Sequence, residues 1–165
     1  MEGVSIDWPQ VWILGYVAFA MLLGAIIGLD REIARKPAGL RTHMLVTGAA
    51  TLFVILGDLT VERFNAELGG QIVRSDPIRV IEAVITGASF LGAGTIIRHG
   101  STQSVEGLTT AASILFATAV GVAVALSHLL LAFGLTMLVL VTLRVLGLVV
   151  RWLRRWNLHE TNVSP

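Results

Sequence analysis

The sequence predicts an all-α integral membrane protein, a bundle of five transmembrane helices. Long apolar stretches, each bordered by charged residues, account for most of its 165 residues. The clearest, residues 11–29, has no charged side chain, and at about 1.5 Å per residue it crosses a hydrocarbon core of roughly 30 Å. Of all residues, 55% are hydrophobic and 14% are charged, whereas soluble domains carry about 25% charged residues. This composition suits a surface that faces lipid.

Five spans follow from the pattern of apolar stretches. They are residues 11–29, 42–57, 78–97, 108–126 and 129–150. The length leaves no room for a second domain. We therefore expect residues 1–165 to form a single transmembrane domain that ends in a short basic cytoplasmic tail, residues 151–165.

The first two spans have local boundary signals. Asp7 can cap the first helix, with Pro9 in its first turn. The first span is expected to be retained, because acidic residues replace the basic flank of a cleavable signal peptide. Pro37 and Gly39 break the chain before the second span. That span is short, so Arg41 is expected to extend its charged group toward the interface.

The third and fourth spans also have start signals. Asp76 followed by Pro77 indicates a helix start, with proline at the first helical position. Residues 100–102 break the chain before the fourth span. There Ser104 can cap the helix and place Glu106 near its positive end.

Two segments outside the predicted spans have distinctive sequences. Residues 58–75 form the longest expected loop, with an amphipathic turn through Phe64 and Leu68. Residues 151–156 are basic and aromatic. They suit either a short helix lying on anionic lipid or the plain end of the fifth helix, and we favour the plain end.

Loop charges predict the orientation. Basic residues gather in the first loop, the third loop and the tail: Arg31, Arg35, Lys36, Arg41, Arg98, Arg151, Arg154 and Arg155. The positive-inside rule then places the N-terminus outside and the C-terminus in the cytoplasm. An odd number of spans requires this split. An inverted or four-span topology is the alternative.

Small residues at helical spacing predict close helix contacts, because lipid tails provide no hydrophobic drive between helices. The residues expected at such contacts are Gly24, Gly28, Gly87, Gly92, Gly94, Ala117 and Gly121. These faces suit packing within the fold and equally suit a homodimer.

Polar residues within the third span form a stripe. Arg79 and Glu82 lie three residues apart and can form an ion pair, and Thr86 and Ser89 continue the stripe inward. A carboxylate at this depth is costly unless paired, so Glu82 is expected to face the bundle interior. A functional role and a purely structural ion pair are both compatible with this pattern.

A second group of charges gathers at the predicted cytoplasmic end. We expect Asp30 to pair first with Arg41 or Arg98. Arg144, inside the fifth span, either extends to the interface or pairs with Asp30. Magnesium binding by Asp30, Glu32 and Glu106 is a weak alternative, because one or two carboxylates suffice for Mg²⁺ while neighbouring arginines oppose it.

Several classes of function are disfavoured by the sequence. The absence of cysteine excludes disulfides and thiol catalysis, and a net charge of +1 gives no indication of nucleic-acid binding. We find no nucleophile–base pair, phosphate loop or zinc motif. The chain is therefore not expected to be an enzyme, and no cofactor is expected.

Five sequence blocks, in order along the chain, resemble the MgtC/SapB family of bacterial inner-membrane proteins. The blocks are residues 28–32, 38–45, 76–79, 87–94 and 105–112. The resemblance covers about residues 20–125. It implies a five-helix membrane domain in the inner membrane, with a cytoplasmic C-terminus. Glu106 departs from the family pattern, which often has arginine there. We also expect the chain to lack the soluble C-terminal domain of longer members.

The resemblance also implies a function. Family members are associated with growth under magnesium limitation and, in pathogens, with virulence. A non-enzymatic role in adaptation to low magnesium, through membrane-protein partners, is favoured. A transporter or channel for magnesium or another small ion is the alternative. The residues implied as functional are Asp30, Arg31, Arg41, Arg79, Glu82, Arg98, Glu106, Gly107, Thr109 and Thr110.

Overall fold

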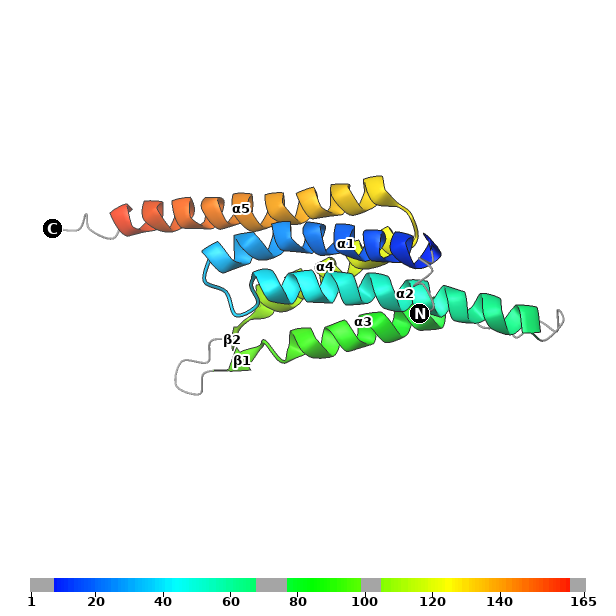
Figure 1. Cartoon of the computed structure of the whole chain (residues 1–165). Coiled ribbons are helices and arrows are strands. Elements are labelled where there is room, and N and C mark those ends of the chain that lie inside the picture. The colour runs from blue at the N-terminus through cyan, green and yellow to red at the C-terminus, as the bar shows by residue number, and fades with distance from the viewer. Residues whose placement is uncertain (1–7, 68–76, 99–104, 161–165) are drawn as a thin grey trace, which may run out of the picture.

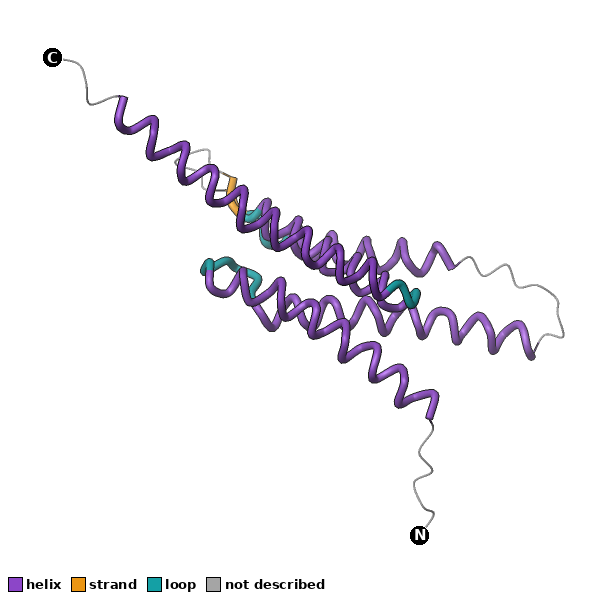
Figure 2. The backbone as a smooth tube through the Cα atoms, turned by 90° about the horizontal axis from the view of Figure 1, so that it is seen from above, coloured by secondary structure: helices purple, strands orange, loops and turns teal. Residues whose placement is uncertain are grey.

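Five helices dominate the computed structural model, which describes residues 8–67, 77–98 and 105–160. In chain order the elements are α1 (Trp8–Ile33), α2 (Leu40–Glu67), α3 (Pro77–Ala93), β1 (Ile97–Arg98), β2 (Val105–Glu106), α4 (Leu108–Ala125) and α5 (Leu129–Glu160). Successive helices run in opposite directions (Figures 1 and 2). The predicted all-α, five-helix fold is confirmed.

Three of the described helices are long and apolar enough to cross a membrane: Pro9–Ile33, Leu40–Phe64 and Leu108–Ala125. A shorter apolar helical stretch, Leu129–Val145, lies in α5. The 17 residues of α3 rise about 26 Å, slightly less than the hydrocarbon core. Large apolar side chains such as Leu14, Phe90 and Leu130 are exposed around the bundle, as expected for a surface that faces lipid.

The second helix is longer than predicted. It begins at Leu40 and continues to Glu67, whereas the sequence predicted residues 42–57. The predicted loop at residues 58–75 is therefore wrong for residues 58–67, which are helical, and so is the predicted turn at Phe64. Leu68 lies outside the described residues. The hydropathy pattern marks the edge of the bilayer. Helical hydrogen bonds, however, form equally well between polar residues outside it.

The third helix is shorter than predicted, because the chain turns at Gly92. Both the backbone N–H and the Oγ1 of Thr95 donate to the Gly92 carbonyl, at 2.9 and 2.7 Å, and these bonds close a turn after α3. Strands β1 and β2 then pair antiparallel, with Ile97 opposite Glu106. The expected cap of α4 at Ser104 is wrong, because Gly107 occupies the cap position, with φ of 93°. Ser104 itself lies outside the described residues.

The fifth helix extends past the predicted end of its span, residue 150, to Glu160. It projects beyond the other helices at the end where α1 finishes (Figure 1). Residues 151–156 are thus helical and continuous with α5, in agreement with the favoured interpretation of the tail.

The core lies around α4, which contacts every other helix. Apolar residues of α1, α4 and α5 form one buried cluster: Ala20, Leu23, Ile27, Val120, Ala123, Val124, Ala132 and Val139. Its small members let these three helices approach closely.

Candidate functional site

Two charged residues at the end of α1 are buried inside the bundle. Asp30 and Arg31 are only 7% and 4% exposed. The Nε of Arg144, on α5, donates to Oδ1 of Asp30. The Arg144 side chain remains 61% exposed, so this ion pair lies at the edge of the bundle and links α1 to α5.

Arg31 turns toward α4. Its Nη2 donates a long hydrogen bond of 3.4 Å to Oγ1 of Thr110, which is almost fully buried. Within the described part of the chain, its Nε is buried without a hydrogen-bond partner. A buried donor left unpaired costs about 1–3 kcal/mol, so other interactions of the bundle must offset the cost of burying Arg31.

His43 extends this polar network to α2. It is fully buried, and its Nδ1 lies 2.9 Å from the Gly39 carbonyl oxygen. Because a carbonyl only accepts, Nδ1 carries a proton and donates. The other ring nitrogen, Nε2, lies 3.0 Å from Oγ of Ser113, which in turn donates to the Thr110 carbonyl at 2.8 Å. Together, Asp30, Arg31, His43, Thr110, Ser113 and Arg144 connect α1, α2, α4 and α5; we call them the inner network.

Glycines bring α1 and α2 close enough to build this network. A Cβ added at Gly24 would lie 2.5 Å from Thr47 Oγ1 and 2.6 Å from the His43 carbonyl oxygen. A Cβ added at Gly28 would lie 2.7 Å from the Cα of Leu40. No side chain fits in either space, so glycine is required at both positions.

Glu32 stabilises the start of α2. Its Oε2 accepts a 3.0 Å hydrogen bond from the backbone N–H of Leu40, the first residue of α2. A carboxylate is favourable there, because it satisfies an unpaired helix N–H at the positive end of the helix dipole.

The buried threonines beyond the inner network are also satisfied. Thr47, Thr118 and Thr136 each donate to a carbonyl of their own helix, at 2.7, 3.0 and 2.9 Å. Thr51 donates to the carbonyls of Thr47 and Gly121, at 3.0 and 2.8 Å, and so ties α2 to α4. Their hydroxyl protons are thus directed at backbone carbonyls.

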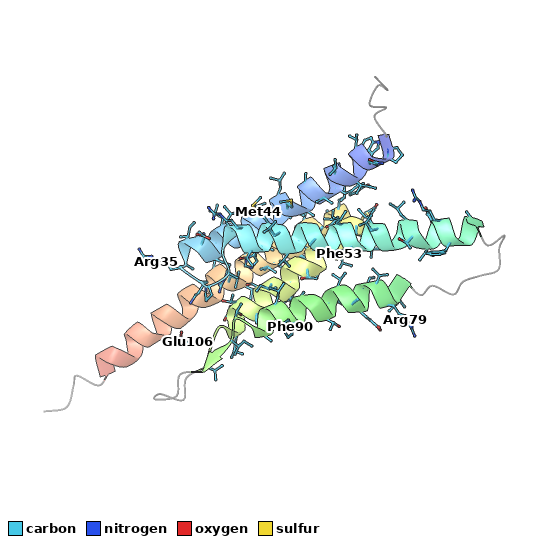
Figure 3. The ribbon with its side chains drawn as sticks, turned by 60° about the horizontal axis from the view of Figure 1, so that its bottom comes forward. Arg35, Met44, Phe53, Arg79, Phe90 and Glu106 are labelled. Carbon is cyan, nitrogen blue, oxygen red and sulfur yellow. The ribbon has the colours of Figure 1, made fainter. Side chains whose placement is uncertain are left out.

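The structure separates the residues singled out by the sequence into two groups. Asp30, Arg31 and Thr110 meet in the inner network. The exposed residues are Arg41, Arg79, Glu82, Glu106 and Thr109. Gly107 precedes α4, and the side chain of Arg98 lies outside the described part. Figure 3 shows Arg79 at the opposite end of the bundle from Arg35 and Glu106.

Two expectations about ion pairs are wrong. Asp30 pairs with Arg144, which was the alternative. The expected pairing with Arg41 does not form, and the side chain of Arg98, the other expected partner, lies outside the described part. Glu82 is exposed instead of facing the interior, and no ion pair joins it to Arg79 in the described structure. Helix α3 buries its Ala88 and Gly92 side, which turns Glu82 outward. Near the end of a span, an exposed carboxylate can reach the headgroups.

Two of the glycines expected at helix contacts do not lie at one. A Cβ at Gly87 would have no atom within 4 Å, and one at Gly94 would meet only carbonyls of its own turn, Phe90 and Leu91. The expected helix contacts of Gly87 and Gly94 are therefore wrong. The other residues expected at such contacts, Gly24, Gly28, Gly92, Ala117 and Gly121, are buried.

Sequence reasoning gave no polar role to His43 or Ser113. His43 lies within the block 38–45 that carries the family resemblance, and Ser113 directly follows the block 105–112; a polar side chain inside an apolar span was the available signal. Their partnership joins residues 70 positions apart, which spacing does not predict. In the described part of the chain, no three His, Asp or Glu side chains gather to hold a metal ion.

The buried charges and glycine contacts of α1, α2 and α4 lie in a region that matches a known family, the MgtC family, over residues 17–152. This chain belongs to the MgtC family. It is 36% identical over 143 residues to an uncharacterized protein of Haemophilus influenzae, covering 87% of this chain and 59% of that protein. It is 31% identical over 151 residues to protein SapB of Bacillus subtilis, covering 92% and 63%.

Protein MgtC of Salmonella typhimurium is 36% identical over 140 residues, covering 85% of this chain and 53% of MgtC. The chain therefore matches between roughly one half and two thirds of the length of these relatives. No solved structure matches it.

Proposed function

We propose that this MgtC-family chain is a non-enzymatic, multi-pass inner-membrane protein that supports growth when magnesium is scarce by acting on a membrane-protein partner. The proposal rests on family membership and on the bundle's architecture. The clustering of basic loops supports a cytoplasmic C-terminus, so the inner network would lie near the cytoplasmic face.

The observation that carries this proposal is that the polar side chains of α3 lie outside the bundle interior. An ion path needs oxygen atoms that are free to replace water around the ion. Glu82, Thr86 and Ser89, which a path through α3 would use, are exposed. A regulator needs no path, and for that reason we favour it over the transporter.

The two groups of residues then have different roles. The inner network sets how α1, α2, α4 and α5 are arranged. The exposed residues Arg41, Arg79, Glu106 and Thr109 are available to a partner or to lipid headgroups. Asp30→Asn would act through the arrangement of the helices, and Arg41→Ala would act through the surface.

Growth of cells that lack the chromosomal copy tests the role of these residues. We expect Asp30→Asn and Arg41→Ala each to abolish growth at low magnesium while the protein still inserts into the membrane. Asp58→Asn and Arg63→Ala are matched controls, because both residues are exposed on α2 away from the network. Normal growth with Asp30→Asn or Arg41→Ala would contradict the proposal.

Ion flux separates the two functions. The purified chain is placed in sealed liposomes with a magnesium gradient, beside an Asp30→Asn sample. We expect no flux above that of protein-free liposomes. Magnesium flux that disappears in Asp30→Asn would overturn the regulator and establish a transporter.

A further inference from the structure

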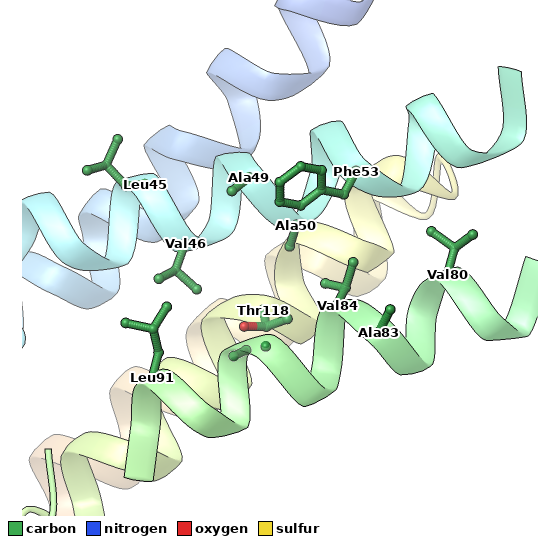
Figure 4. Close-up of a pocket in the computed structure, with 12 residues that line it drawn as sticks. Leu45, Val46, Ala49, Ala50, Phe53, Val80, Ala83, Val84, Leu91 and Thr118 are labelled. Carbon is green, nitrogen blue, oxygen red and sulfur yellow. The ribbon is translucent and has the colours of Figure 1, made fainter. Parts of the chain in front are cut away.

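An apolar groove of about 670 Å³ opens between α2 and α3 (Figure 4). Leu45 and Phe53 project from α2, while Val80, Val84 and Leu91 project from α3. Helix α3 comes close to its neighbours near each of its two ends. A Cβ at Gly57 would lie 2.8 Å from Val80, and one at Gly92 would lie 3.3 Å from Ala111. Between these contacts, Gly87 faces open space.

The lining leaves nothing for a polar ligand to bind. Of the twelve lining residues, Thr118 is the one with a polar side chain, and its Oγ1 already donates to the Ile114 carbonyl at 3.0 Å. The occupant of the middle of the groove must therefore be apolar. Because the groove faces the bilayer, hydrocarbon chains are the medium that surrounds it.

An unpaired charge lies beyond one end of this groove. Leu45, Ala49 and Phe53 form a row of residues spaced by four along one wall, and Arg41 is the next member of that row. Neighbours at this spacing lie on the same side of a helix. Arg41 is exposed and makes no ion pair with any described residue.

The other end is arranged similarly but is less cationic. On α3, Ala83, Gly87 and Leu91 form a row spaced by four, and Arg79 continues it. There, however, the carboxylate of Glu82 lies three residues away and offsets the charge. At the first end, Arg35 and Lys36 are exposed as well. With Arg41 they outnumber the exposed carboxylates of that end, Glu32 and Glu106, and leave a positive potential that attracts anionic headgroups.

We infer that the groove between α2 and α3 is a binding site for an anionic phospholipid, with one acyl chain between the two helices and the phosphate at Arg41. The groove offers an apolar surface to the acyl chain, and the guanidinium of Arg41 offers hydrogen-bond donors and a positive charge to the phosphodiester. The walls favour a flexible chain over a partner helix. Leu45, Phe53 and Leu91 project on both sides of the slot, whereas close helix contacts in membranes need small residues at the crossing.

The test uses the full chain purified in detergent, with retained lipid counted by native mass spectrometry. The probes are dioleoyl phosphatidylglycerol, which is anionic, and dioleoyl phosphatidylcholine, which has no net charge. Gly87→Leu fills the groove without a clash, and Gly15→Leu is its matched control, since a Cβ there also meets no atom within 4 Å. Arg41→Gln removes the headgroup contact, and Arg63→Gln makes the same charge change elsewhere on α2.

Each variant has a separate expected result. We expect Arg41→Gln to lower the preference for phosphatidylglycerol about fivefold, and Arg63→Gln to leave it unchanged. Gly87→Leu should weaken retention of both lipids relative to Gly15→Leu.

The inference is overturned if Gly87→Leu and Gly15→Leu retain lipid equally, or if Arg41→Gln keeps the preference. It is also overturned if lipid binding is unchanged while Gly87→Leu abolishes a stoichiometric complex with another membrane helix or a second copy. Thermal melting of each variant shows whether it is folded, and Arg41→Gln, which removes no hydrogen bond or ion pair of the described residues, tests the inference independently of the groove's packing.

Discussion

The α1–α2 contact and the α2–α3 contact involve the same kind of residue and have opposite outcomes. Gly24 and Gly28 place α1 against the backbone of α2, with no room for a methyl group. On α3, Gly87 follows the small residue Ala83 at the same spacing of four, yet it faces an open groove. The difference lies in what is opposite each glycine. Backbone atoms of α2 lie opposite Gly24, whereas the open groove lined by Leu45 and Phe53 of α2 lies opposite Gly87.

This comparison shows that a small residue permits a close contact without creating one. His43, whose carbonyl lies at this tight contact, also reaches α4 through Ser113, and Thr51 donates to the Gly121 carbonyl of α4. The open contact carries none of these bonds among the described residues. Stability should therefore depend strongly on the first contact and weakly on the second.

The largest expected effect is at Gly24. In Gly24→Leu, the new side chain would overlap Thr47 Oγ1 and the His43 carbonyl, so α1 must move away from α2. We expect a loss of about 3 kcal/mol or more in the free energy of unfolding, measured by denaturation in detergent. Gly15→Leu, on the same helix in open space, should stay within about 0.5 kcal/mol of the wild type. Equal stability of Gly24→Leu and Gly15→Leu would show that the contact between α1 and α2 at Gly24 is not tight.

An intermediate effect is expected at Gly92. A Cβ there would lie 3.3–3.4 Å from three atoms of Ala111 on α4, close enough that a leucine must displace the helix. We expect Gly92→Leu to lower the free energy of unfolding by about 2 kcal/mol. Gly87→Leu, on the same helix, should have almost no effect. If both variants lost equal stability, the groove would not be open as described.

The smallest expected effect concerns the ion pair of the inner network. Arg144→Gln leaves the buried carboxylate of Asp30 without its partner, but solvent at the exposed edge weakens the loss. We expect a decrease of about 1 kcal/mol.

A double-mutant cycle with Asp30→Asn measures the coupling of this pair directly. The double variant should lose less stability than the sum of the two single variants, because it leaves no unpaired charge. Strict additivity would indicate that the two side chains do not interact.

Much of the fold could be predicted from the sequence, and particular residues show why the rest could not. The uncharged run before Asp30 requires a spanning helix, since backbone groups in lipid must bond within their own segment. The end of α3 at Ala93 was missed, because Gly92 and Thr95 are tolerated in a helix and also suit a turn. The extension of α2 to Glu67 was missed, because apolarity reports the bilayer and not the helix.

The candidate site was predicted in part. Asp30, Arg31 and Thr110 were singled out together by resemblance, and the structure brings them into one network. The role of His43 was missed, because its partner Ser113 lies 70 positions away. Only the packing of α2 against α4 brings the two side chains together.

By itself, the sequence determined the class of protein, the number of helices and the approximate position of each, because hydrophobic runs and backbone hydrogen bonding are local properties. The tertiary structure decided which charges pair, which glycines lie at contacts, and where the bundle opens. Asp30 could have reached several arginines at one end of the bundle. The crossing of α1 and α5 selects Arg144, which lies 114 residues away. Such choices depend on how whole helices pack against one another, and no local pattern of residues contains that information.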